Sequence, residues 1–206
     1  MQQLTSRQLY AYWDRLRNGR PAPARCEIEP AEIPALLSET FIAESASDDD
    51  YRFRLAGTRI CQQFGRELRG TDLLGLWVDG DREALAHLLR AVCMDAAVGY
   101  GNFRAYARVD RKVNFEFLLL PLTPRSGNVN QVLGAITAIE LPFWLGTDPL
   151  LRQELVGLKL HRPQVAPSFG KRAGAEVIYL ASRRVRGPAR TRVNSGEDRP
   201  AGFPKF

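Results

Sequence analysis

The segment Tyr51–Gly70 reads YRFRLAGTRICQQFGRELRG, and it decides how the rest of the chain is interpreted. Its first six residues alternate aromatic or aliphatic side chains with arginine, which is typical of a β-strand with one buried and one solvated face. Gly57 interrupts that strand, Thr58 is suited to cap a short helix, and Gly65 is suited to end it. The segment therefore predicts a strand followed directly by a short helix.

The residues on either side of this segment predict an antiparallel sheet. Thr40–Glu44 is rich in β-branched and aromatic residues, and the acidic turn Ser45–Asp50 joins it to Tyr51–Ala56 in a hairpin. A short helix is expected at Pro30–Leu37, and a longer one from Asp79 or Asp81 to about Ala97. Further strands are expected at 103–109, 113–122 and 131–141. This order predicts an α+β fold with helices on one face of the sheet.

The chain begins with an amphipathic helix that Thr5 or Ser6 can cap and that Gly19 ends. Leu9, Trp13 and Leu16 recur at helical spacing and form one apolar stripe. That stripe has two candidate partners: the sheet of its own chain, or the sheet of a second chain across a two-fold axis. The sequence is compatible with both arrangements.

Composition divides the chain into four parts: a helix and connector at 1–25, a domain at 26–142, a short helix at 143–163 and a tail at 164–206. The helix is expected within Pro149–Val156. The net charge of +6 lies entirely in residues 165–206, because the acidic and basic residues before them balance. We expect this Pro-, Gly- and Arg-rich tail to be disordered apart from a short strand near Glu176–Leu180.

Several classes of protein are disfavoured by what the sequence contains. No apolar run reaches the length of about 18 to 20 residues that a membrane span needs, and the N-terminus does not have the pattern of a signal peptide. The three cysteines are odd in number and widely spaced, which indicates a reducing, cytoplasmic setting without a metal site. No serine has a suitable histidine partner and no phosphate-binding glycine loop precedes a helix, so we do not expect an enzyme.

Three parts of the sequence resemble a PAS-like domain family found mainly in alphaproteobacteria. They are Leu9–Trp13, the block Tyr51–Gly70, and Phe117–Leu122 together with Leu133–Ala135. The resemblance covers residues 5–142 and implies a five-stranded antiparallel sheet whose helices enclose a small cleft. It also implies binding of a small ligand or of a signalling partner, and it favours a homodimer formed through the N-terminal helix, with Leu9, Trp13 and Leu16 at the interface.

The central block supplies the candidate ligand site. Arg54, Thr58 and Arg66 are expected to ring the cleft and accept a small anionic ligand. The alternative is that Arg54 and Arg66 form a structural ion-pair network with Glu67. Arginine suits an anion because its planar fork meets a carboxylate or phosphate through two hydrogen bonds. Cys61 lies beside them in sequence and is the fourth candidate.

Two PAS cofactors are disfavoured. His87 falls at 200° on the long helix when Leu85 is set to zero, opposite the apolar stripe, so it is poorly placed to bind haem. His161 lies outside the domain and is no better placed. Covalent flavin chemistry is associated with Asn-Cys-Arg, whereas this sequence has Ile60-Cys61-Gln62, and Cys61 is expected to pack as a core residue.

The sequence therefore predicts a cytoplasmic sensory or regulatory domain that binds a small ligand or a signalling protein. The alternative is a structural dimerisation or adaptor module with no ligand. The basic tail either solubilises the protein or makes weak electrostatic contact with nucleic acid or anionic lipid.

Overall fold

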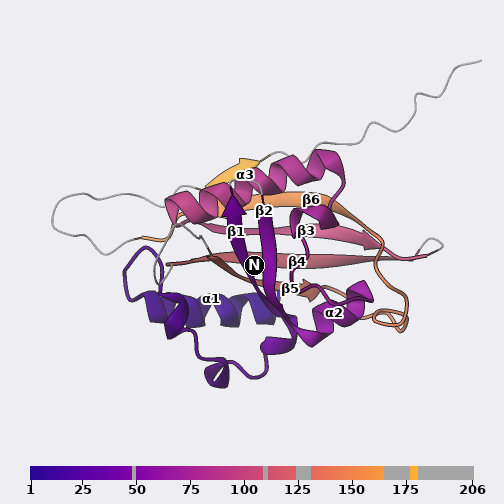
Figure 1. Cartoon of the computed structure of the whole chain (residues 1–206), viewed down its shortest axis with the longest axis horizontal. Coiled ribbons are helices and arrows are strands. Elements are labelled where there is room, and N and C mark those ends of the chain that lie inside the picture. Colours follow the sequence, from indigo (N-terminus) through magenta and orange to yellow (C-terminus); the bar gives the residue numbers. More distant parts are fainter. Residues whose placement is uncertain (48–49, 109–110, 124–130, 165–176, 181–206) are drawn as a thin grey trace, which may run out of the picture.

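The computed structural model describes residues 1–47, 50–108, 111–123, 131–164 and 177–180. Within these residues the order of the principal elements is as follows: α1 (Leu4–Arg17), β1 (Thr40–Ser47), β2 (Asp50–Ala56), α2 (Thr58–Phe64), α3 (Asp79–Asp95), β3 (Val98–Tyr106), β4 (Lys112–Leu122), β5 (Gln131–Ala138), β6 (Arg152–His161) and β7 (Val177–Leu180). The strands form one antiparallel sheet in the order β2-β1-β5-β4-β3-β6-β7 (Figure 1).

The segment Tyr51–Gly70 folds as the predicted strand and short helix, but Leu55, expected on the buried face, is 45% exposed. Tyr51 and Phe53 are buried, and Arg52 and Arg54 are exposed on the other side of β2. A side chain at Gly57 would collide with backbone, because its Cβ would lie 2.3 Å from the carbonyl oxygen of Leu37. This close approach lets α2 begin directly after β2.

The sheet has a hydrophobic core on each face. α2 and α3 cover the face that we call the inner face, and α1 covers the opposite, outer face. Leu9 and Trp13 are fully buried on the outer face, and the indole N–H of Trp13 donates to the carbonyl oxygen of Pro121 at 2.8 Å. The α+β PAS-like arrangement is confirmed, with the N-terminal helix packed on the sheet of its own chain.

The N-terminus of α1 is not capped by the side chain of Thr5 or Ser6, contrary to the prediction from the sequence. The helix begins at Leu4, and the carboxylate of Glu116 on β4 accepts the backbone N–H groups of Gln2 at 2.6 Å and Gln3 at 3.1 Å. Glu116 on a distant strand therefore holds the two residues that precede the helix, whereas the sequence predicted a cap by a local hydroxyl. Thr5 instead donates to Glu39 at 2.6 Å.

The expected helix at 143–163 is wrong, because Arg152–His161 is strand β6. It pairs with β3 from Val98 to Tyr106, and that pairing satisfies backbone groups along the strand. Gly101 allows the strands to come close, since a Cβ there would lie 2.2 Å from the carbonyl oxygen of Gly157. Long-range pairing thus overrides the local helical pattern, and the sheet extends beyond the five expected strands.

Two smaller expectations also change. The expected helix at Pro30–Leu37 is replaced by the 3-10 turns Pro30–Glu32 and Leu37–Glu39. The short strand expected near Glu176–Leu180 is confirmed as β7. The other residues expected to be disordered, 165–176 and 181–206, lie outside the described residues.

Candidate functional site

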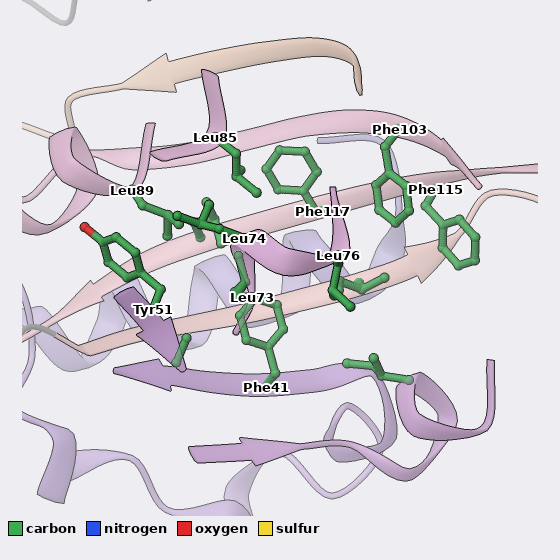
Figure 2. Close-up of a cluster of buried hydrophobic side chains, with 14 of the residues drawn as sticks. Phe41, Tyr51, Leu73, Leu74, Leu76, Leu85, Leu89, Phe103, Phe115 and Phe117 are labelled. Atoms are coloured by element: carbon green, nitrogen blue, oxygen red, sulfur yellow. The ribbon is translucent and has the colours of Figure 1, made fainter. Parts of the chain in front are cut away.

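The interior between the inner face of the sheet and the helices is the first candidate site. Its lining is apolar throughout and consists of Phe41, Phe53, Phe64, Leu73, Leu76, Trp77, Leu85, Phe103, Phe117, Leu119 and Ile136. Figure 2 shows several of these side chains converging from the strands and from the segment before α3. They leave a cavity of about 20 Å³. Pockets for drug-sized ligands measure about 300 to 1,000 Å³, so this interior is filled mainly by its own side chains.

Aromatic rings account for most of this filling. Phe103 stacks on Phe115 with ring centroids 4.9 Å apart, and Trp77 meets the edge of Phe103 at 5.0 Å. Contacts of this geometry stabilise aromatic pairs beyond the burial of their surface. The interior is therefore held by ring contacts that a bulky ligand would have to separate.

Trp77 is the lining residue whose side chain carries a polar atom. Its indole N–H is buried and has no hydrogen-bond acceptor among the described residues. An unsatisfied buried donor costs about 1 to 3 kcal/mol, so the group is available to an acceptor that reaches it. Sequence reasoning missed Trp77 because the segment before it was interpreted as loop. The signal that could have found it is the apolar run Leu73–Leu76 directly before it.

The predicted anion-binding residues do not come together around this cavity. Arg54 lies on the side of β2 away from the buried rings, is 67% exposed, and forms an ion pair with Glu44 at 2.8 Å. Thr58 and Arg66 are exposed, and neither lines the cavity. Alternation along β2 puts Arg54 on the face opposite the aromatic residues of that strand. Since Thr58 and Arg66 also lie away from the cavity, the geometry does not assemble an anion-binding cleft here.

The expected ion-pair network of the central block is also different. The carboxylate of Glu67 accepts the backbone N–H of Arg69 at 3.0 Å and lies 3.5 Å from the Sγ of Cys61. These local contacts, with the backbone bond first, hold the pKa of Glu67 below its ordinary value. Arg54 instead forms its ion pair with Glu44 across the hairpin. The contacts of Glu67 are made within its own turn.

The two half-buried cysteines are kept protonated. Burial raises the pKa of the Cys61 thiol, and the neighbouring Glu67 carboxylate raises it further. Burial also raises the pKa of Cys93 to about 11. A nucleophilic cysteine needs its thiolate favoured, and these surroundings act in the opposite direction. Cys61 packs against the inner core, as the sequence predicted.

The predicted interface residues lie mostly inside the chain. Leu9 and Trp13 are 0% exposed, while Leu16 is half-buried at the edge of the same outer core. Contact with the chain's own sheet therefore occupies the stripe, on the apolar outer face of β4 and β5. A homodimer interface formed by these residues stays a prediction.

His87 is placed as expected, whereas His161 lies in strand β6 of the sheet and not outside the domain. The His87 side chain is 60% exposed on α3, with Nε2 3.9 Å from a Glu83 carboxylate oxygen. Its predicted position away from the apolar stripe is confirmed. The ring of His161 lies beside Tyr10, with centroids 6.5 Å apart.

The surface offers a shallow groove in addition to the interior. It measures about 450 Å³ and runs between α1 and residues 32–36, with an ion pair between Arg15 and Glu32 among its lining residues. The described residues contain no group of three or more His, Cys, Asp or Glu side chains arranged to hold a metal ion. No helix in this part of the chain is long and apolar enough to cross a membrane.

An antiparallel sheet with helices enclosing a small interior, preceded by a packed N-terminal helix, is the arrangement expected of a PAS-like domain. Residues 1–137 match the family described as PAS domain. Since this match covers well over half of the chain, the protein belongs to the PAS domain family. A search of curated proteins found no match.

Proposed function

We propose that this PAS domain is a cytoplasmic regulatory module that acts by docking on other protein chains, including a second copy of itself, rather than by holding a bulky cofactor. The block Tyr51–Gly70 supports a place in the alphaproteobacterial branch of the family. The free thiols of Cys26, Cys61 and Cys93 support a reducing compartment. The raised pKa values of Cys61 and Cys93 support a role without catalysis.

The observation that carries this proposal is the filled interior. A cavity of about 20 Å³ has room for about one water molecule. Haem or flavin would have to displace stacked rings such as Phe103 and Phe115, whose centroids are 4.9 Å apart. A domain whose interior is occupied by its own side chains must transmit a signal through its surface.

Native mass spectrometry of gently purified full-length protein tests the proposal. The expected species are the chain of 23.1 kDa and its dimer, without added mass. An organic molecule that remains bound and is released on denaturation would contradict the docking function. Light scattering on the same sample tests the homodimer, and a mass of one chain at all concentrations would contradict that part.

A second candidate function is sensing of a small, largely apolar molecule with one hydrogen-bond acceptor. The unpartnered indole N–H of Trp77 favours it. Trp77→Phe keeps an aromatic ring and removes the donor. If the interior senses such molecules, cyclohexanone raises the melting temperature of the wild type more than that of the variant. Methylenecyclohexane, which has a similar shape and no carbonyl, is the matched control. Equal shifts for both compounds and both proteins would contradict this candidate.

The basic tail is proposed to make weak contacts with nucleic acid or anionic lipid. Its support is the sequence: residues 165–206 carry all of the net charge of the chain. Such contacts weaken steeply as salt rises. Binding that survives truncation after Gln164 would contradict a role for the tail.

A further inference from the structure

The edge of β6 that points away from β3 is covered by two different segments. In its first half, Trp77 forms an isolated bridge with Gln153, and the carboxylate of Asp81 accepts the backbone N–H of Leu155 at 2.8 Å. In its second half, β7 pairs with Leu158–His161. Among the described residues, β7 is therefore the strand that covers this half of the edge.

β7 is held to β6 by a short pairing and is joined to it by a long connection. It pairs through four residues, and residues 162–176 lie between its first residue and its partner His161. A tight hairpin needs about two to five connecting residues, and this connection has fifteen. Leu158 and Leu160 belong to the inner core and pair with β3 on the other side. Loss of β7 would therefore leave β6 in the sheet with an unpaired edge.

An unpaired strand edge presents a row of backbone N–H and C=O groups that can bind another extended chain. We propose that Leu158–His161 is a strand-addition site for an extended segment of a partner protein, and that β7 occupies it until the partner displaces it. The inference rests on the proposed docking function and specifies one surface for it. The sequence of the present occupant, Val-Ile-Tyr-Leu after Glu176, indicates a partner segment of β-branched and aromatic residues preceded by an acidic one.

Competition with β7 sets the apparent affinity of the site. A tethered segment acts at an effective concentration on the order of millimolar, so a free segment of equal strength hardly competes at micromolar concentration. The apparent affinity for a partner scales with the fraction of molecules whose edge is open. Weakening β7 should therefore tighten binding of an added strand without any change in the site.

Ile178→Pro in the full-length chain tests this directly, because proline removes a backbone N–H and disfavours strand pairing. Ala173→Pro, outside β7, is the matched control. The probe is a fluorescein-labelled peptide with the sequence of residues 175–182, AEVIYLAS, followed by anisotropy. We expect Ile178→Pro to bind it about tenfold or more tightly than the wild type and Ala173→Pro.

Hydrogen exchange at Leu158–His161 gives an independent readout. These amides should lose protection in Ile178→Pro and regain it when the peptide is added. Equal peptide affinity in the three proteins, or unchanged protection in Ile178→Pro, would overturn the proposal. A fall in mass from dimer to monomer in Ile178→Pro would also overturn it, because β7 would then come from a second copy. If one of these three results were obtained together with a ligand-free native mass spectrum, the strand-addition site would be overturned while the proposed docking function remained.

Discussion

Leu9→Ala and Leu4→Ala remove the same atoms from the same helix, but only one of them is expected to be costly. Leu9 is 0% exposed between α1 and the outer face of the sheet, whereas Leu4 is 59% exposed. Removing three buried carbon groups at about 0.8 kcal/mol each costs about 2.4 kcal/mol in transfer free energy. The residual cavity raises the expected cost at Leu9 to about 3 to 4 kcal/mol. At Leu4 it is about 1 kcal/mol or less, because more than half of that side chain remains in water.

Urea unfolding followed by far-UV circular dichroism measures both costs. Repeating it over a hundredfold range of protein concentration separates the two arrangements of α1. Packing on the chain's own sheet predicts that the loss in Leu9→Ala is independent of concentration. Equal free energies of unfolding in the two variants would refute the reasoning. So would a dimer that dissociates only in Leu9→Ala, because the helix would then lie on a second chain.

Three further predictions test other parts of the structure. Gly57→Ala should lower the free energy of unfolding by about 2 kcal/mol or more in thermal or urea melts because its Cβ meets backbone, whereas Gly80→Ala, in α3 with open space around it, should be neutral or stabilising. Burial raises the pKa of Cys93 to about 11 from an ordinary value of 9.0. Its stabilisation is therefore present below pH 9 and lost as the pH rises toward 11, and Cys93→Ala should show a shallower fall of unfolding free energy across that window. Arg54→Ala should change stability by about 1 kcal/mol or less, since the Arg54 side chain is 67% exposed, and a larger loss in urea melts would contradict the placement of Arg54 outside the core.

Residues whose environment is set by near neighbours could be predicted from the sequence. The alternation of Tyr51–Ala56 gave the strand and its buried face, because successive side chains of a strand point to opposite sides. The same alternation should have argued against Arg54 as a cleft residue, since Phe53 directly before it faces the core. Gly57 and Gly65 marked the limits of α2, and the left-handed conformation confirms the reason at Gly65. At Gly57 the backbone is extended, and the reason is instead its close approach to the carbonyl oxygen of Leu37.

Features that depend on distant partners could not be predicted. Residues 152–161 have an ambiguous local pattern, and they become a strand because β3 offers unpaired backbone along its edge. Glu116 accepts the backbone N–H groups of Gln2 and Gln3, directly before α1, from more than a hundred residues away. Trp77 enters the interior only because the segment before α3 folds over the sheet.

The sequence by itself determined the α+β class, the hairpin around the central block, and the apolar stripe of α1, since each depends on side-chain periodicity over a few residues. The tertiary structure decided where those surfaces go: α1 onto the chain's own sheet, the arginines of the central block into solvent, and the aromatic rings into a nearly full interior. The physical reason is that periodicity fixes which face of an element is apolar, whereas the partner of that face depends on contacts between segments far apart in the chain.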